Sequence, residues 1–214
     1  MKMKQEPLFS IDAIQPSGEE ALSVWRERAY ACKGCKLHET RERVVFGSGN
    51  SKRPDVCFVG EAPRAAEEKE NLPFAGNGGR LLLNMIDKMG LKPEQVYCCN
   101  VVCCKPSDLG LAPSAEEIDA CQPILHGQLR VVQPRVIITL GLTATETLLR
   151  KKKHLFEMRG KWWDWMGTPV RPTFHPNGMF GKEGEKNRGT CFVDLMAAMN
   201  KLREMDRPPD WRTK

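Results

Sequence analysis

With 214 residues, of which 41% are hydrophobic and 28% charged, the chain has the composition of a soluble globular protein with one core. No run approaches the roughly 20 apolar residues that a membrane span needs. The first ten residues are polar and lack the apolar core and cleavage pattern of an export signal, so we expect a cytoplasmic protein with no membrane partner. The net charge of +6 is compatible with a nucleic-acid partner, but many proteins without one share it.

The predicted elements alternate between helices and strands along one domain. We expect a flexible arm over 1–18, a single domain over 19–205 and a tail over 206–214. The apolar spacing predicts, in chain order, a helix over 19–31, a strand over 56–59, a helix over 79–89, a strand over 96–104, a helix over 114–132, a strand over 134–141, a helix over 142–149, a strand ending at 175 and a helix over 193–202. This alternation predicts an α/β fold of three layers, α/β/α, around a central four-stranded, mainly parallel sheet.

Polar residues end several of these strands. Glu61 follows the first strand directly, Asn100 interrupts the second, and His175 ends the last. In a parallel sheet these strand ends meet at one edge, where open α/β sheets bind their ligands. A buried amide such as Asn100 is costly unless it has a partner or lies at a strand end. The sequence therefore predicts a site at this edge, although each residue alone is equally compatible with a purely structural role.

The nine cysteines are an odd number in a chain without an export signal, which disfavours a disulfide framework and favours metal ligation or buried thiols. Cys32 and Cys35 form a CxxC pair, and Cys104 and Cys121 supply a second pair. Four thiolates brought together would suit either tetrahedral zinc or an iron–sulfur cluster. Spacing alone does not choose between Cys103 and Cys104.

A set of short motifs, in this order and spacing, resembles the iron–sulfur uracil-DNA glycosylases, the fourth family of the uracil-DNA glycosylase superfamily. The resemblance runs from about Cys32 to Leu195, and the motifs are Gly60-Glu-Ala-Pro63, Pro73-Phe-Ala-Gly76, Asn100-Val-Val-Cys-Cys-Lys-Pro106, Leu140-Gly141 and Thr173-Phe-His-Pro176. It implies that family's fold and a DNA-repair enzyme that flips uracil out of DNA and hydrolyses its N-glycosidic bond. It also implies a structural [4Fe-4S] cluster, held by Cys32, Cys35, Cys104 and Cys121.

The same resemblance assigns roles at the sheet edge. Glu61 would orient a water and offset positive charge on the sugar, and His175 would donate a hydrogen bond to uracil O2 as a neutral imidazole. Phe74 would stack on the base, and Asn100 would pair with uracil N3–H and O4 in a pattern that cytosine reverses. Glu67 falls where the family excludes the methyl group of thymine.

Further residues are expected to contact DNA. Met179 or Phe180 would fill the gap left by the flipped base, and Arg159, Lys161 and Lys186 would contact phosphates, although a solvated charged face is the simpler interpretation of these cations. The implied partners are DNA with a damaged base and, beyond it, replication or repair factors that act with a monomeric enzyme.

Two departures from the family pattern leave alternatives open. Arg64 stands where the family has glycine, and it could narrow the base pocket, contact a phosphate or pair with Glu61; a tight pair would oppose the role given to Glu61. The loop after His175 also differs. A second hypothesis is therefore the same fold acting on another deaminated base, hypoxanthine or xanthine, and a third is a DNA-binding protein without catalysis.

Overall fold

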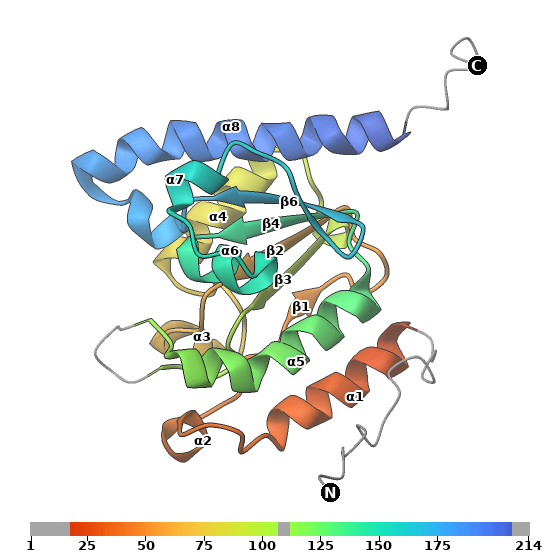
Figure 1. Ribbon diagram of the computed structural model, residues 1–214, viewed down its shortest axis with the longest axis vertical. Coiled ribbons are helices and arrows are strands. Elements are labelled where there is room, and N and C mark those ends of the chain that lie inside the picture. The colour runs from red at the N-terminus through yellow and green to blue at the C-terminus, as the bar shows by residue number, and fades with distance from the viewer. Residues whose placement is uncertain (1–17, 107–111, 207–214) are drawn as a thin grey trace, which may run out of the picture.

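A six-stranded sheet forms the centre of the structure, a computed structural model that describes residues 18–106 and 112–206 (Figure 1). Its strand order is β1-β3-β2-β4-β6-β5. The four inner strands are parallel: β3 (Val96–Asn100), β2 (Val56–Gly60), β4 (Val136–Leu140) and β6 (Thr168–Thr173). The outer strands, β1 (Ser48–Gly49) and β5 (Trp163–Trp165), pair antiparallel to their neighbours. The α/β prediction is confirmed, and the predicted four strands are the parallel ones.

Helices cover both faces of this sheet, which gives the predicted three layers. Alternate residues of β2 face opposite sides: Cys57 and Val59 pack with α1 (Gly18–Tyr30) and α5 (Ala115–Val132), whereas Val56 and Phe58 pack with α4 (Asn77–Lys88) and α8 (Gly181–Asp206). All residues of β2 and β4 are buried. This burial from both sides explains their continuous apolar runs.

Two predicted strands have different bounds in the structure. The strand predicted over 96–104 ends at Asn100, its last residue paired with β2, so Asn100 lies at a strand end and not inside a strand. The last strand runs over Thr168–Thr173 and ends before His175. Pro169 and Pro172 lie within it, and prolines weaken the sequence signal of a strand because they donate no ladder hydrogen bond.

The remaining helices are short. They are α2 (Leu37–Thr40), α3 (Ala65–Glu70), α6 (Leu142–Leu149) and α7 (Leu155–Met158), with 3₁₀ turns at Pro93–Gln95 and Pro176–Met179. A capping box starts α5, since Ser114 Oγ accepts from Glu117 N and Glu117 Oε2 accepts from Ser114 N. The final helix is longer than the predicted 193–202 because its first half is polar and carries little apolar spacing.

The predicted arm and tail lie outside the described residues, apart from Gly18, which opens α1, and Asp206, which closes α8. Among the helices that the structure describes, none is long and apolar enough to cross a membrane. The arrowheads of the parallel strands all point to one side of the molecule (Figure 1). The loops that follow these strands therefore meet at a single edge of the sheet, as predicted.

Candidate active site

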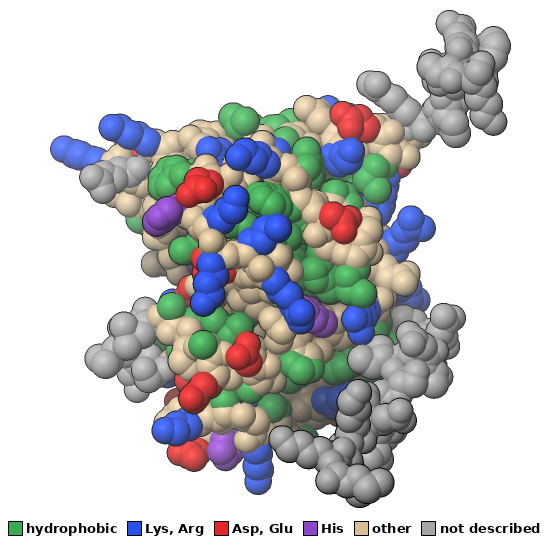
Figure 2. Space-filling model, viewed as in Figure 1, with side chains coloured by type: hydrophobic (Ala, Val, Ile, Leu, Met, Phe, Trp, Pro, Cys, Tyr) green, Lys and Arg blue, Asp and Glu red, His purple; other side chains and the backbone are tan. Residues whose placement is uncertain are grey.

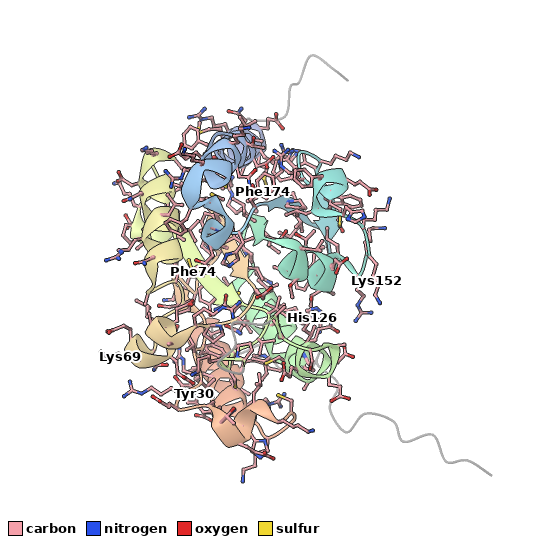
Figure 3. The ribbon with its side chains drawn as sticks, turned by 90° about the vertical axis from the view of Figure 1, so that its left-hand side faces the viewer. Tyr30, Lys69, Phe74, His126, Lys152 and Phe174 are labelled. Atoms are coloured by element: carbon pink, nitrogen blue, oxygen red, sulfur yellow. The ribbon has the colours of Figure 1, made fainter. Side chains whose placement is uncertain are left out.

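The carboxyl edge of the parallel strands brings together the polar residues that the sequence singled out. Figure 3 looks onto this edge, with Phe74 labelled. Gly60, the last residue of β2, lies beneath the side chains of Phe74 and Asn100: a β-carbon there would be 2.8 Å from Phe74 Cζ and 2.3 Å from Asn100 Oδ1. Only glycine leaves room for both side chains to converge at this point.

The carboxylate of Glu61 is held on both of its oxygens. Arg64 Nη2 donates to Oε1 at 2.9 Å, and Thr143 Oγ1 donates to Oε2 at 2.6 Å. The ion pair with Arg64 offsets part of the negative charge that Glu61 would offer to a substrate. The side chains of Arg64 and Glu61 are 35% and 21% exposed, so solvent weakens their attraction. Thr143 was not identified from the sequence. Its place in the first turn of the helix after β4 puts it at the carboxyl edge of the sheet, and this place was the signal that could have found it.

His175 is held in one tautomer. Its Nδ1 accepts a hydrogen bond of 3.1 Å from Asn177 N, so the ring hydrogen of the neutral imidazole lies on Nε2. Burial lowers the pKa of His175 below its ordinary value; the nearby Glu61 opposes this shift and Arg64 adds to it. The residue is therefore a neutral hydrogen-bond donor near neutral pH.

Glu67 fixes the loop that carries Phe74. Its Oε1 accepts from Phe74 N at 2.7 Å and its Oε2 accepts from Arg64 N at 2.9 Å. Phe74 has a φ of 60°, in the left-handed region that large side chains rarely adopt. Burial raises the pKa of Glu67, and the two backbone hydrogen bonds and the nearby side chain of Asn100 oppose that shift. In this structure Glu67 therefore holds a strained backbone that aims an aromatic ring over Gly60.

Asn100 carries an unsatisfied buried group. Asn100 is 3% exposed. Its side chain lies close enough to Glu67 to lower the pKa of that carboxyl group, but its Nδ2 makes no hydrogen bond of normal length and angle among the described residues. Leaving a buried donor unpaired costs about 1–3 kcal/mol. A donor kept in this state next to Phe74 indicates a ligand that accepts from it.

The predicted DNA contacts divide into exposed and buried residues. Met179 is 0% exposed and packs in the core against α8, so its prediction as a surface wedge is wrong; the 3₁₀ turn after His175 points it inward. Phe180 is 49% exposed and fits that role. Arg159 donates to Asp194 Oδ2 at 2.9 and 3.1 Å, so it is held in an internal ion pair, and its contact with phosphate stays a prediction.

Lys161 and Lys186 are both exposed. Lysine and arginine side chains spread over the whole face shown in Figure 2 and do not form one patch there. Surface charge on that face therefore does not mark a binding site by itself.

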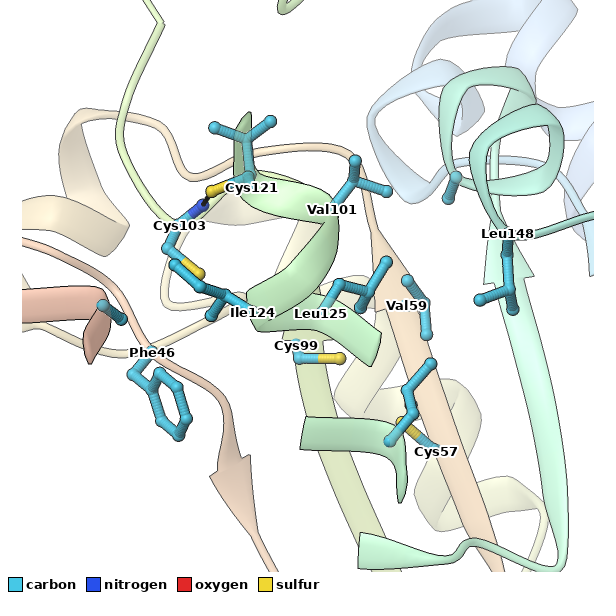
Figure 4. Close-up of a cluster of buried hydrophobic side chains, with 14 of the residues drawn as sticks. Phe46, Cys57, Val59, Cys99, Val101, Cys103, Cys121, Ile124, Leu125 and Leu148 are labelled. Carbon is cyan, nitrogen blue, oxygen red and sulfur yellow. Dashed lines mark hydrogen bonds between the residues drawn. The ribbon is translucent and has the colours of Figure 1, made fainter. Parts of the chain in front are cut away.

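A second group of residues lies away from this edge, where five cysteines line one small hollow: Cys32, Cys35, Cys103, Cys104 and Cys121. The hollow lies between the CxxC segment after α1, the chain after β3, and α5. Several donors point at its sulfurs. Cys103 N donates to Cys121 Sγ at 3.4 Å (Figure 4), and Arg41 Nη1 donates to Cys104 Sγ at 3.3 Å. A hydrogen bond with Cys103 also lowers the pKa of Cys121.

The positions of these thiols can be compared with the geometry of a zinc site. Zinc–sulfur bonds of about 2.3 Å would bring four tetrahedral thiolates to about 3.8 Å from one another. Among the described residues, no set of three or more His, Cys, Asp or Glu side chains is close enough to hold one metal ion. The thiols that line this hollow have the donor chemistry of a metal or iron–sulfur site.

Comparisons with known proteins identify the relatives of the chain. The family model described as "Uracil DNA glycosylase superfamily" matches residues 46–199. A "Type-4 uracil-DNA glycosylase" of Thermotoga maritima is 36% identical over 188 residues, which cover 87% of this chain and 97% of that protein. Proteins of the same name from Sulfurisphaera tokodaii and Saccharolobus solfataricus are 38% and 39% identical, over 73% and 68% of this chain and 74% and 70% of their own.

Proposed function

Since the chain belongs to the uracil-DNA glycosylase superfamily, and within it to the type-4 enzymes, we propose that it excises uracil from DNA by hydrolysing the N-glycosidic bond. It is a DNA-repair hydrolase whose product is an abasic site. The target base cannot be reached inside a duplex, so the enzyme flips it into the pocket at the carboxyl edge of the sheet. We further propose a cytoplasmic monomer that acts on the nucleoid.

The reaction places opposite charges on the two fragments. As the bond breaks, the sugar gains oxocarbenium character and the base gains negative charge. Glu61 offsets the charge on the sugar and orients the attacking water through the lone pairs that Arg64 and Thr143 leave unused. His175 donates from Nε2 to uracil O2, where charge develops, because its Nδ1 is already an acceptor.

The unpartnered Nδ2 of Asn100 is the observation that best supports uracil as the substrate. In the complex this group donates to O4, and Oδ1 accepts from N3–H. Cytosine presents the reverse pattern at both positions and would leave both groups unpaired, which is the strongest form of discrimination available to a buried site. Phe74 stacks on the base from the side of Gly60, and Glu67 maintains its orientation.

We propose that Cys32, Cys35, Cys104 and Cys121 hold a [4Fe-4S] cluster in the hollow that they line. When bound, this group supplies a structural link and takes no part in bond cleavage. The four residues tie the segment after α1 to the chain after β3 and to α5. Arg41 assists by donating to Cys104 Sγ and to Tyr30 O, at the end of α1.

An oligonucleotide with a single uracil tests this function. Incubation with the protein, followed by alkali, should cleave the strand at the uracil. Asn100→Asp should weaken the preference for uracil over cytosine, because a buried carboxyl group can be protonated and then offer a donor or an acceptor at either position. An intact strand at stoichiometric protein with its iron present would contradict the proposal. Unchanged discrimination in the variant would remove Asn100 from recognition.

A further inference from the structure

Thr143 donates a shorter hydrogen bond to Glu61 than Arg64 does, and no sequence motif assigned it a role. Its hydroxyl donates to Oε2 at 2.6 Å, a length typical of a hydroxyl bound to an ionised carboxylate. A carboxylate has about four lone-pair sites. With one taken by Thr143 and one by Arg64, the rotation of the carboxylate plane is restricted and the remaining sites face fixed directions.

The turn between β4 and α6 places Thr143 there, and the same turn contacts His175. Gly141 N donates to Thr173 O at 2.9 Å, which ties the turn to the end of β6. Gly141 has a φ of 88°, and a β-carbon on it would lie 3.1 Å from His175 Cβ. Thr143 follows two residues later, in the first turn of α6. One short segment therefore contacts both groups that act on the glycosidic bond.

The position of Glu61 relative to α6 adds to this restraint. Its carboxylate lies against the first turn of an eight-residue helix, where the unpaired backbone N–H groups favour negative charge. Arg64, by contrast, reaches Glu61 with a side chain that is 35% exposed. A long, partly exposed side chain restrains its partner less than a short hydroxyl on a helix, since more rotamer freedom is lost when it is held.

We propose that Thr143 is a positioning residue for excision: it holds the carboxylate of Glu61 in the orientation that directs water to the sugar. This inference rests on the proposed uracil excision and deepens it, because it names the residue that sets the geometry of the catalytic carboxylate. Thr143 acts through Glu61, so its removal slows bond cleavage and leaves binding of uracil-containing DNA unchanged.

Single-turnover excision and DNA affinity, measured on Thr143→Val and Thr143→Ser, test the proposal. The valine variant keeps the shape of the side chain without its hydroxyl, and its rate should fall by about 10–100-fold with Kd within about 2-fold of wild type. Serine restores the hydroxyl and should recover the rate to within about 3-fold. Thr147→Val is the matched control, because Thr147 lies four residues further along the same helix and makes no hydrogen bond to Glu61; it should leave both quantities unchanged.

A double-mutant cycle with Glu61→Gln separates positioning from general loss of structure. If Thr143 acts through Glu61, Thr143→Val should have little further effect in the Glu61→Gln background. An equal loss in both backgrounds, or a wild-type rate in Thr143→Val, would overturn the proposal. A wild-type protein that leaves uracil in place would refute the proposed function itself, whereas an active wild type with an equally active Thr143→Val refutes only this inference.

Discussion

Replacing Asn100 by leucine should remove activity without loss of stability. Leucine has the same branching as asparagine and about the same size, so it should fit beside Phe74 and Gly60. The unpaired Nδ2 destabilises the free protein by about 1–3 kcal/mol. Leucine removes that cost, and it also removes any stabilising interaction that Oδ1 makes. We therefore expect the free energy of unfolding to stay within about 1 kcal/mol of wild type, or to rise.

The effect on excision should be far larger. Leucine leaves uracil N3–H and O4 unpaired in a buried pocket, which at about 1–3 kcal/mol for each group lowers kcat/KM by about 10²–10⁴-fold. Thermal unfolding and excision kinetics should be measured on protein with equal iron content, with Asn84→Leu on the exposed side of α4 as the control for an added leucine. A loss of more than about 2 kcal/mol of stability with excision intact would show that Asn100 is structural and would refute this reasoning.

Three further predictions concern the neighbouring groups. Because burial lowers the pKa of His175, the excision rate should fall only as the pH drops below the ordinary imidazole value of 6.5, and a decline that begins above 6.5 would contradict a neutral donor. Arg64→Gln removes the ion pair with Glu61 and should raise the single-turnover rate by up to about 5-fold, since partly exposed pairs contribute about 0.2–1 kcal/mol; a slower variant would show that Arg64 assists Glu61. Cys104→Ser should lose iron and its brown colour whereas Cys103→Ser should keep both, and the reverse result would make Cys103 the ligand.

The sequence predicted the part of the site that depends on strand order. Glu61 and His175 follow parallel strands and Asn100 ends one, and parallel strands bring their ends to one edge whatever the details of packing. The same reasoning failed for the bounds of β6, because its two prolines hide the strand pattern. It also placed Asn100 inside a strand, whereas the strand ends there.

Side-chain partners distant in the sequence were beyond prediction. Arg159 belongs to a basic segment that predicted phosphate contact, but Asp194, which is 0% exposed on α8, binds it together with Arg171. A buried carboxylate requires such partners, and nothing near Arg159 in the sequence identifies it. Met179 is likewise buried because of a 3₁₀ turn that no apolar period announces. For both Arg159 and Met179, the sequence did not predict the direction in which the side chain points once the surrounding chain has folded.

Release of free base from a panel of oligonucleotides tests the central claim most directly. Each duplex would carry uracil, hypoxanthine, xanthine or thymine at the same position, and freshly purified protein of measured iron content would be present in excess. The arrangement of Phe74, Asn100 and His175 at the carboxyl edge predicts rapid release of uracil, and Glu67, at the position where the family excludes the methyl group of thymine, predicts no release of thymine. Faster release of hypoxanthine or xanthine than of uracil, or release of no base at all, would contradict the account.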